Sequence, residues 1–139
     1  MGFGEAVRSC FDKFLTFSGR ARRAEYWWFV LFCVLGSIIA GVIDRALFGS
    51  AVIETYDSIE IIQKSVVGGI FSLVTFFPSL SVMVRRLHDT GRSGWWFWIN
   101  LIPLVGWLVF LWFMLKPGDR GANFYGPDPI GDQPLYPRA

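Results

Sequence analysis

Three stretches of the chain contain no Asp, Glu, Lys or Arg, and each is long enough to cross a bilayer. They run from Tyr26 to Ile43, from Ser65 to Val84 and from Ser93 to Leu115. A bilayer core about 30 Å thick needs about 20 residues of helix, because each helical residue rises by about 1.5 Å. The sequence therefore predicts an all-α integral membrane protein with transmembrane helices at 26–43, 66–84 and 95–115.

The composition excludes the main alternative classes. Of 139 residues, 53% are hydrophobic and only 17% are charged, whereas a soluble domain has about 25% charged residues. So few charged side chains cannot form the polar surface that a soluble protein of this length needs around its core. The length predicts a single domain that comprises residues 1–139. The high hydrophobicity excludes disorder, and two cysteines are too few for a disulfide-stapled secreted fold.

The segments outside the three stretches have different patterns. Residues 3–17 place Phe3, Val7 and Phe11 on one side of a helical wheel and polar residues on the other, which predicts an amphipathic surface helix. In the connection 44–64 we expect one or two turns of helix around residues 53–62. Five prolines and four glycines in residues 116–139 predict an irregular tail. The patterned sequence before residue 26 argues against a cleaved signal peptide.

The third stretch allows two geometries, because Pro103 and Gly106 can bend it or turn it back. Lys and Arg are enriched on cytoplasmic flanks, so the bases before the first stretch and after the second place the N-terminus in the cytoplasm. Three full spans would put 8 bases inside and 5 outside, whereas a re-entrant third segment would put 11 inside and 2 outside. The charge rule favours the re-entrant form, but we predict three spans from the continuous apolar length.

The turn RRLHDTGRSGWW, from Arg85 to Trp96, is the most distinctive passage in the chain. Arginine binds phosphate through two parallel hydrogen bonds, and the cytoplasmic leaflet carries anionic headgroups. The predicted site for a lipid headgroup or a partner comprises Arg20, Arg22, Arg23, Arg85, Arg86, His88, Asp89 and Arg92. The alternative is that these arginines only anchor the topology and pair with Asp89 and Glu25.

Catalytic and metal sites are not predicted. His88 and Asp89 lie beside Ser93, but sequence neighbours seldom have the geometry of a catalytic triad, and a turn explains them better. One histidine and two distant cysteines give no metal-ligand spacing, and no cofactor is expected. The spans lack ionisable residues, which argues against a transporter. The bases flank membrane segments, so nucleic-acid binding is not expected.

Four strings together resemble a known family: FSGRARRAEYW from Phe17, FPSL leading into RRLHDTGRSGWW, IPLVG from Ile102, and GANFYGPDP from Gly121. The sequence is similar to the domain-of-unknown-function 805 family of small bacterial inner-membrane proteins, over nearly the whole chain. The resemblance implies a multi-pass protein of the inner membrane with several helices and no established activity, substrate or cofactor. The long connection between the first two stretches departs from the family pattern.

Three functions remain open. The leading hypothesis is a non-enzymatic scaffold or interaction module that binds anionic lipid headgroups or a membrane partner through a basic cytoplasmic face. The alternatives are a small oligomeric channel or transporter subunit, and a lipid-modifying enzyme that uses His88 and Asp89. We expect the GRARR segment and the RRLHD turn to lie at the same headgroup depth of the membrane and to form one site. If the tail is also cytoplasmic, Asn123, Tyr125 and Asp128 join that site.

Overall fold

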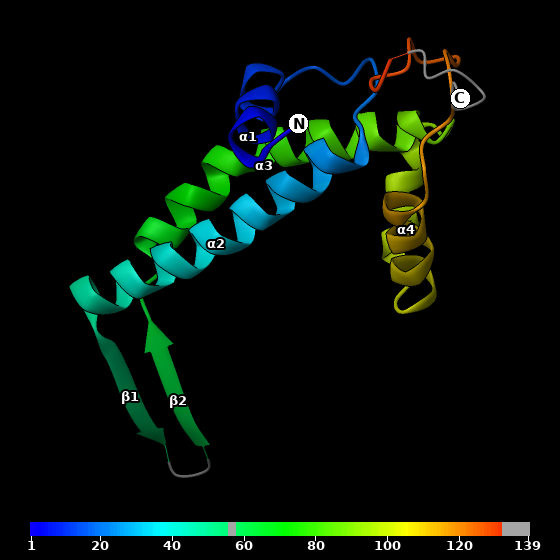
Figure 1. The fold of residues 1–139 in the computed structure, drawn as a ribbon. Coiled ribbons are helices and arrows are strands. Elements are labelled where there is room, and N and C mark those ends of the chain that lie inside the picture. The colour runs from blue at the N-terminus through cyan, green and yellow to red at the C-terminus, as the bar shows by residue number, and fades with distance from the viewer. Residues whose placement is uncertain (56–57, 132–139) are drawn as a thin grey trace, which may run out of the picture. The chain divides into compact units, whose positions relative to one another are not determined.

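The computed structural model describes residues 1–55 and 58–131 (Figure 1). The elements are, in chain order, α1 (Phe3–Asp12), α2 (Arg23–Phe48), β1 (Ser50–Thr55), β2 (Ser58–Gln63), α3 (Val66–Asp89), the 3-10 helix η1 (Gly94–Leu101) and α4 (Val105–Leu115). The chain forms two compact units. The head unit comprises Met1–Val30 and the described residues from Phe77 onward, and the β unit comprises Leu31–Phe76.

Helices α2 and α3 are long and apolar enough to cross a membrane. They have 26 and 24 residues, and the mean hydropathy of their most apolar windows is 2.2 and 1.9. Only 11% and 22% of those windows is buried, so most of the apolar side chains point outward. A core helix of a soluble protein buries such side chains, whereas a helix in lipid exposes them. The predicted spans 26–43 and 66–84 lie within these two helices.

The third predicted span, 95–115, is not one helix. Pro103 carries no N–H and disfavours a helical conformation at the residue before it. Ile102 is accordingly extended, and Leu104 has a left-handed φ of 63°. The chain reverses here, and the Nε1 of Trp107 donates to the carbonyl of Asn100 at 3.0 Å. The prediction of a continuous transmembrane helix is therefore wrong, and η1 and α4 form a helical hairpin, residues 94–115.

Gly106 lets the two arms of this apolar hairpin approach each other. A Cβ atom built on Gly106 would lie 1.9 Å from the carbonyl oxygen of Ile99, so no other residue fits without separating the arms. At the other end of the hairpin, the rings of Trp96 and Phe113 meet edge to face at 5.5 Å. The hairpin thus begins and ends close to the same point of the head unit.

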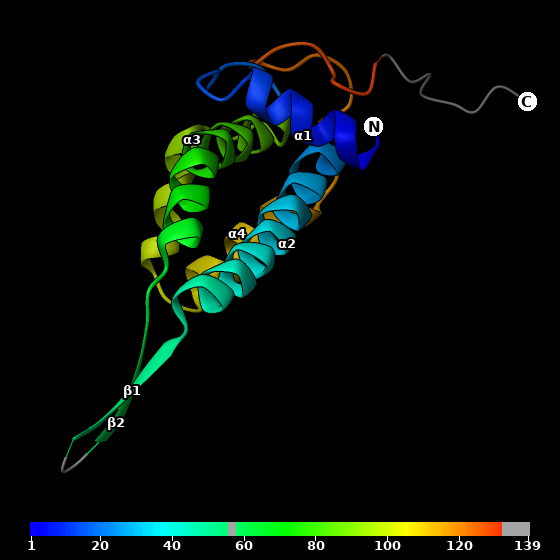
Figure 2. The same ribbon diagram turned by 90° about the vertical axis from the view of Figure 1, so that its left-hand side faces the viewer.

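The connection between α2 and α3 differs from the helical turns expected around residues 53–62. It is a pair of antiparallel strands in which Val52 lies opposite Ile61 and Glu54 lies opposite Ile59. The strands continue away from the ends of α2 and α3 (Figure 2). This segment is rich in Val, Ile and Thr, which favour strands over helices because their side chains branch at Cβ.

The N-terminal helix is shorter than the expected range 3–17, because α1 ends at Asp12. Its Ala6 and Cys10 are buried, whereas Arg8 and Asp12 are exposed. The ring of Phe11 packs against Phe29 of α2 at 5.8 Å. Helix α1 therefore has one face on the start of α2, and its place on a membrane surface stays a prediction.

In the β unit, Asp44 of α2 caps the start of α3. Its two carboxylate oxygens accept hydrogen bonds from the backbone N–H groups of Val67 and Gly68, both at 2.8 Å. Further along the two helices, Gly36 of α2 faces the ring of Phe71 of α3, which a Cβ at Gly36 would meet at 2.2 Å. The first helical turn of α3 is thus fixed by a carboxylate that lies more than twenty residues earlier in the chain.

Candidate functional site

Asp89, at the end of α3, is the centre of a buried arginine cluster in the head unit. Its Oδ1 accepts from Arg20 at 3.0 Å, and its Oδ2 accepts from Arg86, one helical turn earlier. The three side chains are at most 3% exposed. Two guanidinium groups around one carboxylate leave a net positive charge inside the head unit, and further acceptors are needed to solvate it.

The backbone of the tail supplies those acceptors. Arg20 donates to the carbonyls of Asp119, Gly121 and Gly126, which lie about a hundred residues later in the chain. Arg86 donates to the carbonyl of Lys116, at the end of α4. These carbonyl oxygens carry partial negative charge, so they stabilise the guanidinium groups without forming ion pairs.

The approach of the tail to Asp89 depends on a glycine. The N–H of Asp119 donates to the carbonyl of Asp89 at 2.7 Å, which brings the two backbones together. A Cβ at Gly118 would lie 2.0 Å from the Oδ2 of Asp89. A side chain at this position would displace the carboxylate that Arg20 and Arg86 share.

A second buried pair joins α2 to α3. The Oε1 of Glu25 accepts from Arg85 at 2.7 Å and from the hydroxyl of Ser9 at 3.0 Å. The hydroxyl of Ser81 lies between the Nε of Arg85 and the carbonyls of Lys13 and Thr16. The N-terminal segment, α2 and α3 are therefore linked through one ion pair and its hydrogen bonds.

His88 takes part in the same packing. Its Nδ1 lies 3.0 Å from the carbonyl of Gly19, and its ring stacks on Tyr125 with centroids 4.0 Å apart and an interplanar angle of 4°. Asn123 donates to the carbonyl of His88 at 2.9 Å. Ser93, which follows in sequence, accepts from the N–H of Trp95 and caps η1. His88 and Ser93 thus each have a role in the fold, in a turn and a cap.

Asp128 holds the end of the described tail. Its carboxylate accepts from the backbone N–H groups of Ile130 and Gly121, both at 3.0 Å. The N–H of Ile130 is the largest cause and lowers the pKa of Asp128, burial opposes it, and the N–H of Gly121 and the charge of Arg20 lower the pKa further. The carboxylate therefore stays ionised around neutral pH and keeps the tail folded beside Arg20.

The structure divides the predicted site residues into two groups. Arg20, Arg85, Arg86, His88 and Asp89 come together and are buried. The other three lie around them: Arg23 donates to the carbonyl of Leu115, Arg92 stacks over Phe113 at 4.2 Å, and Arg22 is half-buried. The basic rim is defined as the described bases of the head unit that form no ion pair with another described residue: Lys13, Arg22, Arg23, Arg92, Lys116 and Arg120.

Sequence reasoning named Glu25 only as an alternative partner, and it missed Ser81 and Gly118. Their partners are distant in sequence, so no local spacing indicates them. The tail residues Asn123, Tyr125 and Asp128 do join the cluster, as expected for a tail on the same side. Within the described residues, no group of three His, Cys, Asp or Glu side chains is arranged to hold a metal ion.

Two long apolar helices with outward-facing side chains, joined at one end by a buried arginine cluster, define a helical membrane protein. Residues 14–127 match the family described as "Protein of unknown function (DUF805)", and the chain belongs to this family. The resemblance seen in the sequence is thereby confirmed.

Two relatives from Escherichia coli strain K12 support an inner-membrane location. Inner membrane protein YhaI is 40% identical over 121 residues, which cover 87% of this chain and 92% of the relative. Inner membrane protein YhaH is 36% identical over 122 residues, which cover 84% and 89%. No solved structure matches the chain. The protein is therefore similar over most of its length to bacterial inner-membrane proteins.

Proposed function

We propose that this protein is a non-enzymatic interaction module of the inner membrane that binds anionic lipid headgroups on its basic rim. The observation that carries the proposal is the division of its bases. Arg20, Arg85 and Arg86 are buried against Asp89 and Glu25 and hold the head unit together. The rim bases are left for an anionic ligand, and a phosphate headgroup is the anion that a membrane supplies at this depth.

The aromatic side chains around Arg92 favour a lipid over a soluble ligand. Arg92 stacks over Trp96 and Phe113, with its guanidinium 5.1 Å and 4.2 Å from the ring centroids. The neighbouring Trp95 is 77% exposed. Tryptophan is enriched at the headgroup level of membranes, because its ring is apolar and its N–H is polar. A cation held among such rings is well placed for a headgroup phosphate.

The proposal includes an orientation with the head unit and the N-terminus in the cytoplasm, and with α2 and α3 as two crossings. Of the described bases, only Arg45 and Lys64 belong to the β unit, and all others belong to the head unit. Because Arg20 binds the tail, the N-terminal segment and the tail lie on one side. The bias of Lys and Arg towards the cytoplasm then favours the head unit there.

The test compares the lipids that the protein retains. Wild-type protein and the Arg22→Ala, Lys116→Ala, Arg120→Ala variant are reconstituted in nanodiscs with phosphatidylglycerol and phosphatidylcholine and released for native mass spectrometry. Each base near an anionic surface contributes about 1 kcal/mol, so the variant should lose at least about tenfold in affinity for phosphatidylglycerol.

The matched control is Arg45→Ala, which removes an exposed base of the β unit. It should retain phosphatidylglycerol like the wild type. Equal retention by the rim variant, or a wild type without preference for the anionic lipid, would contradict the proposal. Loss of lipid by Arg45→Ala as well would show that net charge, rather than the rim, determines binding.

A further inference from the structure

We infer that the apolar hairpin, residues 94–115, inserts into one leaflet of the bilayer from the side of the head unit and contacts acyl chains without crossing. The inference concerns the depth of this hairpin, and its test does not depend on which ligand the basic rim binds. With this hairpin, the protein has two membrane crossings and one element that enters a single leaflet. The hairpin contacts the hydrocarbon of that leaflet.

The surface of the hairpin is apolar on both arms and at the tip. The exposed side chains include Trp98, Leu101, Leu104, Leu108 and Trp112, whose exposed fractions lie between 52% and 74%. Residues 93–115 contain no charged side chain. A soluble surface rarely carries an apolar patch of this extent. Phe113 and Met114 at the base of the hairpin pack with Leu87 of α3, whereas both arms and the tip keep exposed apolar side chains. A protein partner would have to cover both arms, whereas acyl chains surround them, so this exposure favours lipid.

The length of each arm matches half a bilayer. Helix α4 has 11 residues, which at about 1.5 Å per residue span about 16 Å. The 3-10 helix η1 has 8 residues, which at about 2 Å per residue also span about 16 Å. The hydrocarbon core is about 30 Å thick, so the turn at residues 102–104 reaches the region where the two leaflets meet.

Several backbone groups of the turn pair with one another, which lowers the cost of a chain reversal in hydrocarbon. The N–H of Ile102 donates to Ile99, and the N–H of Gly106 donates to the carbonyl of Ile102, at 3.0 Å and 3.1 Å. Pro103 has no N–H to leave unpaired, and its carbonyl accepts from Val105 at 2.8 Å.

The two polar side chains near the turn are also paired inside the hairpin. The amide of Asn100 donates to the carbonyl of Phe97 at 2.8 Å, and the indole N–H of Trp107 donates to the carbonyl of Asn100 at 3.0 Å. A water-exposed hairpin has no requirement for such internal pairing, so the pairing supports a place in lipid.

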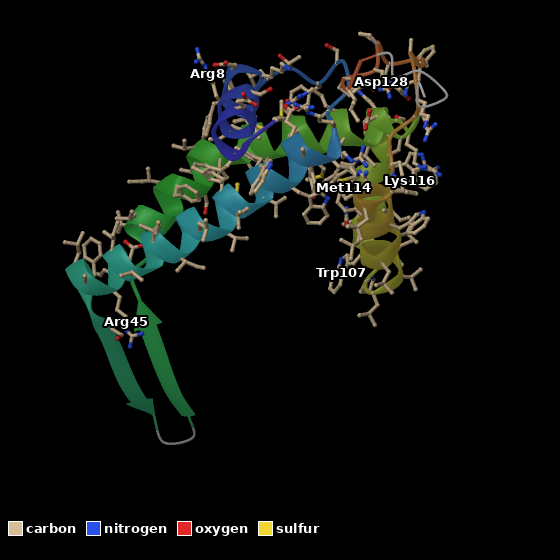
Figure 3. All side chains as sticks on the ribbon, viewed as in Figure 1. Arg8, Arg45, Trp107, Met114, Lys116 and Asp128 are labelled. Carbon is tan, nitrogen blue, oxygen red and sulfur yellow. The ribbon has the colours of Figure 1, made fainter. Side chains whose placement is uncertain are left out.

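The other end of the hairpin is held by a guanidinium group and an indole. Arg23 donates to the carbonyl of Leu115, and Trp27 donates to that of Met114, both at 3.2 Å. These carbonyls end α4, where the helix dipole is negative and basic side chains are favourable. Figure 3 labels Trp107 on the tip side of α4 and Met114 and Lys116 at its opposite end. The hairpin is therefore fixed at its polar end and free at its apolar end.

The experiment maps single cysteines in the full chain after Cys10 and Cys33 are replaced by alanine. Ser18→Cys and Ala122→Cys report the head unit, Ser50→Cys reports the β unit, and Leu101→Cys reports the hairpin tip. Each variant is treated with a membrane-impermeant maleimide in spheroplasts and in inverted vesicles. Sides are compared with that of Ser18→Cys, so the result does not depend on the proposed orientation.

We expect Ala122→Cys to be labelled from the same side as Ser18→Cys, Ser50→Cys from the opposite side, and Leu101→Cys from neither. A fluorophore on Leu101→Cys, attached in detergent before reconstitution, should be quenched more by a nitroxide near the end of the acyl chain than by one near the headgroup. Labelling of Ala122→Cys from the same side as Ser50→Cys would mean that residues 94–115 cross the membrane. Labelling of Leu101→Cys from the head side, or protection without quenching, would mean that the hairpin lies outside lipid or under protein.

Discussion

At the residue scale, we expect Asp89 to contribute more to the stability of the head unit than an exposed carboxylate does. It is the shared counter-charge of two buried guanidinium groups, and the backbone of the tail approaches it closely. Asp89→Asn removes that charge and leaves Arg20 and Arg86 buried without compensation. We expect the free energy of unfolding in detergent micelles to fall by about 3 to 5 kcal/mol, the usual cost of breaking a buried pair from one side.

The matched control for this variant is Asp12→Asn. Its carboxylate pairs with Arg8 on the surface of α1 at 3.7 Å, and both side chains are exposed. Exposed pairs contribute little, because water and salt screen them. The stability of the control should therefore stay close to that of the wild type. A similar loss in the two variants would show that burial of the cluster does not determine its contribution.

A second prediction at this scale concerns pH and Asp128. Its folded pKa lies below the ordinary value of 3.8, so its contribution to tail folding is complete above that value and is lost as the pH falls through the lower folded pKa. Protection of the Gly121 and Ile130 amides against hydrogen exchange should decline in that acidic window. In Asp128→Asn the protection of these amides should already be weaker at neutral pH, and it should not decline further in the acidic window. An unchanged pH response in the variant would contradict this assignment.

At the element scale, Asp44 determines how α3 begins. Asp44→Ala removes the acceptor for two N–H groups of the first turn, and loss of such a cap costs about 1 kcal/mol. Hydrogen exchange at Val67 and Gly68 should accelerate accordingly. Asp44→Asn keeps a side-chain oxygen and should show a smaller effect. Arg45→Ala, beside it on α2, is the control, and no change in Asp44→Ala would refute the cap.

Gly106 makes the apolar hairpin possible as an element. Gly106→Ala places a methyl group against the Ile99 carbonyl, and backbone contacts of this kind force a shift that costs about 1 to 3 kcal/mol. We expect lower thermal stability and loss of protection at the hairpin tip. Gly41→Ala is the control, since its Cβ meets nothing within 4 Å. If both variants melt alike, close approach of the two arms does not hold the hairpin.

Among the elements, the sequence predicts α2 and α3 well because apolar length is a local property. Apolar length is a weaker guide for residues 94–115. Their total length suits a membrane span, but Pro103 and the conformation of Leu104 reverse the chain. The strands β1 and β2 were missed because a short mixed segment has no clear helical or strand period. The cap by Asp44 depends on a contact between two helices, which no local pattern reveals.

At the scale of the whole molecule, the sequence predicts that the two basic segments meet, and they do, but it does not show which bases are buried. Arg20 and Arg22 are indistinguishable as sequence letters beside a membrane span. Their difference arises because the tail folds back over Arg20, with contacts between residues about a hundred positions apart. The resemblance over nearly the whole chain identified the family. The family has no assigned functional residues, so the resemblance predicted no role for any residue of the arginine cluster.

The two compact units should respond separately to loss of the tail. A chain that ends at Pro117 keeps the Lys116 carbonyl for Arg86 but removes the acceptors of Arg20 at Asp119, Gly121 and Gly126. Arg20 then loses the backbone that covers it and keeps only Asp89 as a partner, so the contacts of the N-terminal segment with α3 should weaken. Exchange of the Ala21 amide, which donates to the Arg85 carbonyl at 3.0 Å, should accelerate.

The amides of Val67 and Gly68 report the β unit in the same shortened chain. Their protection rests on Asp44, which has no bond to the tail among the described contacts, so it should be unchanged. Faster exchange in both units would mean that the molecule unfolds as one cooperative block. Unchanged exchange at Ala21 would mean that the ion pairs of Asp89 and Glu25 hold the head unit without the tail. Only a loss confined to Ala21 supports a head unit whose stability comes from joining both ends of the chain.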